Sequence, residues 1–407
     1  MSLPPAFQDA MPSTDEVRLI ADGFFTSVHV WFPIINRNKF YGNFTHASLQ
    51  HETDLALLVL CMKMLIAQPS GDESNSKATY LSVKSLLVQL EQAGFFSITI
   101  LQALLLTALY EIGAGIYPSA YMTVGTCARY ASALSLDRDI FKWDQSASDW
   151  IGMEERHRAW WAAVVLDRTC PERAPCTPDP TELQYLPLLD SDWDLGKRPR
   201  AAPLRLSASF EEKLGKFARM AQATHLLARV LRHLRDVTMD REFLDGEMET
   251  LDRALRSLLD LTVAEEMSTN ATAFCSPIAL LGSALLLLHS YSVTPINSVD
   301  SPAKLTKQGY IMAIECNTRA VLPIARRIRN AWASAPRHPS PFVLDWMYRC
   351  TVACNSIQKG HASVDENCMQ EVREAMKLLA YQWPVGDLYF ELLETRQWTN
   401  LQLEADA

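Results

Sequence analysis

Residues 154–180 read EERHRAWWAAVVLDRTCPERAPCTPDP. From Ala159 to Leu166 no residue is charged, so two helical turns are apolar on every face. A helix of this kind is buried, because a surface helix carries only one apolar stripe. Glu154 and Glu155 precede the run, where the helix dipole favours negative charge. The stretch therefore predicts a central core helix that ends in a stiff, proline-rich loop.

Two adjacent tryptophans lie in the middle of this predicted helix. Trp160 and Trp161 project about 100° apart, so each can fill a different gap in the surrounding protein. We predict that both pack in the core. The alternative is that they form the wall of a ligand site.

A charged pair ends the predicted helix. Asp167 and Arg168 need partners there, because an unpaired buried charge costs on the order of several kcal/mol. We predict that Arg168 binds carbonyl groups at the helix end or pairs with an acid of the following loop, with Asp190, Asp192 and Asp194 as the candidates. The alternative is that Arg168 holds an anionic or carbonyl group of a ligand.

The rest of the chain also shows helical periodicity. Apolar residues recur at spacings of three and four, and the 407-residue chain has only 15 glycines. We predict an all-α protein with two helical halves joined by a packed, proline-rich loop within residues 171–203. The expected organisation is a linker-like segment over 1–16, a first helical region over 17–200 and a second half over 201–407 that packs on the first as one structural unit.

A second group of candidate residues is aromatic. Tyrosines at core edges can offer hydroxyl groups to a cavity for a mainly apolar small molecule, and half-buried packing is the alternative. Together with the central helix, this group gives the candidate ligand-binding residues Tyr110, Tyr117, Tyr121, Arg129, Trp160, Trp161, Asp167 and Arg168.

Charge and motifs argue against several function classes. The net charge of −9 disfavours direct nucleic-acid binding, and the best basic cluster, ARRIRN at 325–330, is interpreted as a solvated helix face. The longest apolar run, at 277–291, is shorter than the roughly 20 residues of a membrane span and predicts a core helix. No metal-ligand, nucleotide-cradle or nucleophile motif occurs, so we expect no metal and no cofactor.

Three segments in order resemble the fungal transcription factor regulatory domain, the middle homology domain. They are VRLIADGFFTSVHVWFPIINRNKFYGNF (17–44), SITILQALLLTALYEIGAGIYPSAYMTVGTCARYASALSLDRD (97–139) and MEERHRAWWAAVVLDR (153–168), the most distinctive. The resemblance covers roughly residues 17–200. It implies an all-α regulatory fold and a role in transcription.

The chain departs from the family pattern in two places. The loop TCPERAPCTPDP stands where family members show a small Gly-Arg-Pro-like turn. The binuclear zinc cluster, which uses six closely spaced cysteines among basic residues to place a helix on DNA, has no counterpart upstream of Val17, where cysteine, lysine and arginine are absent.

Two functions follow as hypotheses. The first is a transcription-regulator-like effector domain that binds a small apolar natural product or a protein partner, acts through a DNA-binding partner protein, and works in the nucleus. The second is a cytoplasmic enzyme of fungal secondary metabolism, a cofactor-independent cyclase or isomerase that reuses the helical pocket. Both are intracellular. A gene model that lacks an upstream zinc-cluster module is a third reading.

Overall fold

The computed structural model describes residues 12–43, 53–67, 73–144, 146–170, 174–236, 240–268, 276–290, 303–332, 340–357 and 366–405. Within these ranges every regular element is a helix, and one isolated bridge joins Tyr185 to Arg205. The prediction of an all-α fold is confirmed. Residues 1–11 of the predicted linker lie outside the described part, and the first described helix begins at Thr14.

The chain divides into two compact units. Unit 1 comprises Met1–Ile112 with Ile116–His225, and unit 2 comprises Gly113–Gly115 with Leu226–Ala407. In unit 1 the helices are α2 (Thr14–Thr26), η1 (Val28–Val30), α3 (Arg37–Asn43), α5 (Thr53–Ile66), α6 (Glu73–Gln92), α7 (Ile98–Gly113), α8 (Tyr117–Ala133), α9 (Leu136–Asp139), α10 (Trp150–Arg168) and α11 (Asp190–Asp194). Helix α12 (Lys216–Arg235) crosses the boundary between the units.

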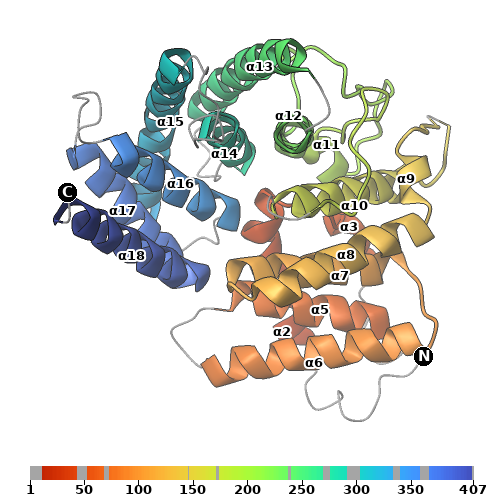
Figure 1. Cartoon of the computed structure of the whole chain (residues 1–407). Coiled ribbons are helices and arrows are strands. Elements are labelled where there is room, and N and C mark those ends of the chain that lie inside the picture. The colour runs from red at the N-terminus through yellow and green to blue at the C-terminus, as the bar shows by residue number, and fades with distance from the viewer. Residues whose placement is uncertain are drawn as a thin grey trace. The chain divides into compact units, whose positions relative to one another are not determined.

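Unit 2 continues with α13 (Arg241–Ser268), α14 (Ser276–Ser290), α15 (Ala303–Trp332), α16 (Pro341–Ile357), α17 (Glu366–Gln382) and α18 (Val385–Ala405). Its centre is α14, which contacts α13, α15 and α16 (Figure 1). Leu280, Leu281 and Leu285 of α14 are buried, so the apolar run is the core helix that its composition predicted.

Helix α10 has the same central position in unit 1. It packs against α8 and α9, and α8 lies beside it in Figure 1. Asp149 caps its first turn by accepting a hydrogen bond from the backbone N–H of Gly152. Every residue from His157 to Arg168 is buried, which confirms the predicted central helix.

Among the described helices, none combines the length and the apolar composition that crossing a membrane requires.

Candidate functional site

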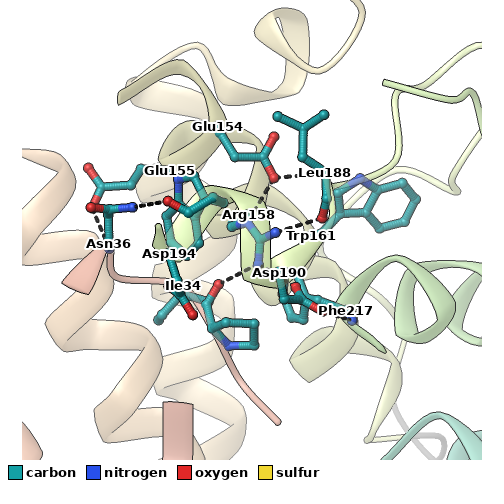
Figure 2. Close-up of polar contacts among 12 residues, drawn as sticks. Ile34, Asn36, Glu154, Glu155, Arg158, Trp161, Leu188, Asp190, Asp194 and Phe217 are labelled. Atoms are coloured by element: carbon teal, nitrogen blue, oxygen red, sulfur yellow. Dashed lines mark hydrogen bonds and ion pairs between the residues drawn. The ribbon is translucent and has the colours of Figure 1, made fainter. Parts of the chain in front are cut away.

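The first turns of α10 form a buried polar centre around Arg158. The fully buried guanidinium makes four hydrogen bonds: Nε to Glu154 Oε1 at 2.7 Å, Nη1 to the Pro33 carbonyl at 3.1 Å and to Asp190 Oδ1 at 2.8 Å, and Nη2 to the Leu188 carbonyl at 2.8 Å. Figure 2 shows the guanidinium between these groups. Because they come from three separate parts of the chain, Arg158 ties those parts together.

Aromatic rings cover this guanidinium. Its central carbon lies 4.1 Å from the centre of the Trp193 ring and 5.6 Å from that of Phe217. A guanidinium attracts the negative face of an aromatic ring, and the attraction grows when water is excluded. The stacked rings therefore seal Arg158 from solvent and compensate part of the cost of burying its charge.

A second set of contacts extends from the neighbouring Glu155. Its Oε1 accepts from the backbone N–H of Asn36 at 3.0 Å, and its Oε2 accepts from Lys39 Nζ at 2.5 Å. Asn36 also donates from Nδ2 to the Trp193 carbonyl at 2.8 Å, and Gln102 Nε2 donates to the Ile34 carbonyl at 2.7 Å. Glu155 thus fixes the turn before α3 against α10.

The charges at this centre are unevenly balanced. Burial raises the pKa of Glu154 to about 7, although the nearby Arg158 lowers it in part. Burial lowers the pKa of Arg158, but the charges of Asp190 and Glu154 outweigh that effect and leave its pKa above the ordinary value. Glu154 Oε2 has no hydrogen-bond partner among the described residues. One buried cation thus faces two carboxyl groups, which favours a proton on Glu154.

The tandem tryptophans are fully buried in α10. Trp161 Nε1 donates to the Tyr185 carbonyl at 2.9 Å, which connects α10 to the proline-rich loop. Trp160 Nε1 has no hydrogen-bond partner among the described residues. Both indoles therefore pack in the core, as predicted.

The charged pair at the end of α10 holds the loop that follows. Asp167 Oδ2 accepts from the backbone N–H of Thr177 at 2.7 Å, from its hydroxyl at 2.6 Å and from Arg168 Nη1 at 2.7 Å. Asp167 also accepts from the backbone N–H of Cys176 at 3.0 Å. Both side chains are almost completely buried. The pair thus forms a latch: its buried hydrogen bonds hold residues 176–179 against the end of α10.

The predicted partners of Arg168 are partly wrong. The carbonyl groups that it binds, those of Thr177 and Pro178, belong to the loop and not to the helix end. It does pair with an acid of the following loop, but that acid is Asp179, and it also pairs with Asp167. Asp190 pairs with Arg158 instead, and Asp194 contacts His29. Residues 177–179 lie against the end of α10, so Asp179 reaches the guanidinium and the later acids do not.

The four remaining candidates lie on α7 and α8 or at the start of α8. Tyr110 and Tyr121 are half-buried, Tyr117 is 38% exposed, and Arg129 is exposed. The Tyr110 ring lies against that of Tyr80, with centroids 5.6 Å apart. A ligand-binding role for these residues stays a prediction.

A pocket of about 190 Å³ opens between α6, α7 and α8, close to these tyrosines in sequence. Its lining residues are Lys84, Leu87, Val88, Glu91, Phe95, Phe96, Ile100, Leu104, Thr123, Thr126 and Tyr130. None of the eight predicted ligand-binding residues belongs to the lining. The adjacent Phe95 and Phe96, just after α6, were the overlooked sequence signal. The structure leaves both exposed, and large apolar side chains that stay exposed mark binding surfaces.

An ionic cluster around the buried Glu111 and the partly exposed Lys84 lies at the polar end of this pocket. Lys84 Nζ donates to Glu111 Oε1 at 2.9 Å, to Ser119 Oγ at 3.3 Å and to Thr123 Oγ1 at 3.0 Å. Glu111 is fully buried and also accepts from the hydroxyl of Tyr80 at 2.7 Å. The cluster satisfies all three donors of the Lys84 ammonium group.

These arrangements differ in what they can do. The Arg158 centre and the Asp167–Arg168 latch are closed, so they fix the fold and expose no reactive group. The pocket between α6 and α8 is open and combines apolar walls with a few polar groups, the usual character of a small-molecule site. In the described part of the chain, no group of three or more His, Cys, Asp or Glu side chains could hold a metal ion.

Comparison with known proteins gives a family match. The family described as "Fungal specific transcription factor domain" matches residues 21–243, which include almost all described helices of unit 1. Transcription factor BOA15 of Botryotinia fuckeliana is 37% identical over 145 residues, which are 35% of this chain and 81% of that protein. No solved structure matches the chain.

Two further relatives are more distant. An uncharacterized transcriptional regulatory protein of Schizosaccharomyces pombe is 24% identical over 279 residues, 65% of this chain and 44% of that protein. The depudecin biosynthesis cluster-specific transcription activator DEP6 of Fusarium langsethiae is 25% identical over 179 residues, 40% of this chain and 29% of that protein. The chain therefore matches less than half the length of these two relatives.

Proposed function

The chain belongs to the fungal-specific transcription factor domain family, and on that premise we propose that it is the effector part of a regulator of natural-product genes. Its role is transcriptional regulation, as in the relatives named above. The observation that carries the proposal is the BOA15 match, which extends over 81% of that transcription factor. The printed role of DEP6, activation of a biosynthesis cluster, supports the choice of natural-product genes.

The second part of the proposal is that the chain reaches DNA through a DNA-binding partner protein in the nucleus. Its nine cysteines contain no run of six closely spaced ones, and its net charge is −9. Three carboxylates neutralise the basic cluster on α15: Arg326 pairs with Glu371, Arg329 with Glu371 and Glu374, and Arg327 with Glu266. Paired arginines offer little positive field to a phosphate backbone.

The third part is that a small apolar ligand regulates this activity from the pocket between α6 and α8. The pocket's own contacts support this assignment, because the Tyr130 hydroxyl of α8 donates to the Phe95 carbonyl after α6 at 2.9 Å and so holds two of its walls together. A preformed pocket lowers the ordering cost of binding.

A tagged full-length chain tests the regulatory role. We expect purification from nuclei to recover a DNA-binding protein, and chromatin immunoprecipitation to place the chain at promoters only while that partner is present. The Arg326→Glu/Arg329→Glu double variant is the matched control, since removal of a basic cluster should leave a partner-mediated promoter signal unchanged.

Two outcomes would contradict the proposal. One is tight, salt-sensitive binding of the purified chain to promoter DNA, lost in the double variant, because that would show direct contact with phosphates. The other is a chain found entirely in the cytosol without a DNA-binding partner.

A further inference from the structure

The wall of the pocket between α6 and α8 is built in advance by a rigid helix end. Gly94 has φ +72°, and the backbone N–H groups of Gly94 and Phe95 donate to the carbonyls of Glu91 and Leu90, both at 3.0 Å. This is a Schellman motif, in which a left-handed glycine ends the helix. The motif sets the direction in which Phe95 and Phe96 leave α6.

Contacts with α8 hold the same wall from the other side. The Tyr130 hydroxyl donates to the Phe95 carbonyl at 2.9 Å, and the rings of Phe96 and Tyr130 stack with centroids 4.7 Å apart. Yet Phe95 is 43% exposed and Phe96 is 55% exposed. The stacked Phe96 ring and the Phe95 side chain on its held backbone, both open to solvent, form a ready surface for a flat apolar molecule.

Two hydroxyl oxygens of the lining can accept a hydrogen bond but have already used their hydrogens. The hydroxyls of Tyr130 and Thr126 already donate to carbonyls of Phe95 and Met122, which leaves their oxygen lone pairs free to accept. The Lys84 ammonium has no donor left, because its three bonds go to Glu111, Ser119 and Thr123. A ligand that binds the Tyr130 or Thr126 oxygen must therefore supply the hydrogen itself.

The charges near the pocket restrict the ligand further. Glu91 lines the mouth, and the buried Glu111 already neutralises Lys84. The local excess is one negative charge, so a carboxylate or phosphate ligand would meet repulsion. The volume of about 190 Å³ is below the roughly 300–1,000 Å³ of sites for drug-sized molecules, which limits the ligand to one or two rings.

We propose that this pocket binds a small mono- or bicyclic aromatic molecule that carries an O–H or N–H donor and no negative charge, as in a phenol. The ring lies against Phe95 and Phe96, and the donor faces the acceptors at Glu91, Thr126 and Tyr130. The inference rests on the proposed function, since it names the ligand class for that regulatory pocket.

Three naphthalene probes test the class on the purified full-length chain by ligand-observed NMR titration. We expect 2-naphthol to bind about tenfold more tightly than 2-naphthoate, a difference of roughly 1.4 kcal/mol. Naphthalene, which lacks the donor, should be intermediate. Glu91→Gln should narrow the gap between naphthol and naphthoate, because it removes the repelling charge. Equal or tighter binding of naphthoate to the unchanged chain would overturn the inference.

Two tryptophan variants on α6 locate the site. Val88→Trp fills the pocket, whereas Leu81→Trp, two turns earlier on the same helix, is outside the lining. Val88 is 50% exposed and Leu81 is 57% exposed, so neither change should unfold the protein, and circular dichroism checks this. We expect naphthol affinity to fall about tenfold or more in the first and to stay within about twofold in the second. Equal affinity in both variants would overturn the location.

The ligand and the regulatory role can fail separately. If naphthol does not bind but nuclear purification still recovers the DNA-binding partner, the pocket assignment is wrong and the proposed regulatory role is retained. If naphthol binds as expected but no DNA-binding partner is recovered, the pocket assignment is retained and the proposed regulatory role is wrong.

Discussion

Arg158 and Asp190 form an ion pair of 2.8 Å although 32 residues separate them in sequence. Asp190 belongs to the proline-rich loop within residues 171–203, so this contact fixes where that loop returns to α10. Arg158 is fully buried, whereas the Asp190 side chain is 23% exposed. The pair thus joins the core of unit 1 to the protein surface.

Loss of the guanidinium should destabilise unit 1 strongly. Arg158→Met leaves the Pro33 and Leu188 carbonyls without their donor and Asp190 without its cation, and we expect the free energy of unfolding to fall by about 3–5 kcal/mol. Arg156→Met is the matched control: Arg156 pairs with Asp139 and is 34% exposed, so its loss should cost about 1 kcal/mol or less. Urea unfolding followed by tryptophan fluorescence measures both. Similar losses in the two variants would refute the central role of Arg158.

Stability should depend on pH through Glu154. Its pKa in the folded protein is about 7, above its ordinary value, so the folded state holds a proton that the unfolded state releases. That contribution is fully present below about pH 4.5 and is lost as the pH rises toward 7, by on the order of 2–3 kcal/mol. Glu154→Gln should abolish this loss of stability with rising pH. Unfolding midpoints between pH 5 and 8 for both proteins give the comparison, and parallel curves would contradict the prediction.

His157 should act in the opposite direction over an overlapping pH range. Burial lowers its pKa to about 4, so the unfolded state binds the proton more readily between about pH 4 and 6.5. Stability is therefore lost as the pH falls through this range. We expect His157→Gln to be less sensitive to acid than the unchanged chain when unfolding is measured at pH 4.5 and 6.5. An unchanged acid sensitivity would argue against a neutral, buried imidazole.

The two adjacent tryptophans of α10 allow a matched test of one hydrogen bond. Trp160 and Trp161 are both fully buried, but only Trp161 has a hydrogen-bond acceptor among the described residues, the Tyr185 carbonyl. Trp161→Phe should therefore cost about 1 kcal/mol more than Trp160→Phe, because it leaves that carbonyl without its donor. Chemical unfolding of the two variants measures the difference. A larger loss of unfolding free energy in Trp160→Phe would show that packing, rather than the hydrogen bond, determines the cost of each substitution.

The Asp167 latch should control the loop after α10. Asp167→Asn places an amide against backbone N–H groups of Cys176 and Thr177, and we expect a loss of about 2–4 kcal/mol. Asp179→Asn, at a carboxylate 36% exposed, should cost about 1 kcal/mol or less. Hydrogen exchange over residues 174–180 should become faster in the first variant only. Slow exchange there in Asp167→Asn would show that other contacts hold the loop.

Sequence patterns predicted the fold better than the polar contacts. The uncharged run from Ala159 to Leu166 identified the central helix because burial on every face leaves a compositional trace. The apolar run that became α14 was equally clear. These patterns depend only on neighbours within a few residues, which a sequence displays directly.

The partners of the charged residues could not be read in the same way. Glu154 was interpreted as a residue near the helix start, yet it is fully buried and binds Arg158, four residues later. The spacing of four was visible, but the burial depends on residues near 33 and 190, which reach α10 only through the tertiary fold. The pocket was missed for a related reason, since its walls come from three helices.

The Arg158 centre also has a consequence for biosynthesis. A nascent chain that has left the ribosome only as far as Arg168 contains Glu154, Arg158 and the Pro33 carbonyl, but neither Leu188 nor Asp190. Two of the four hydrogen bonds of the guanidinium cannot yet form. The charged start of α10 then lacks part of its final environment, and the tryptophan that covers it, Trp193, is still to be translated. Unit 1 must therefore wait for the synthesis of the proline-rich loop before its core can close.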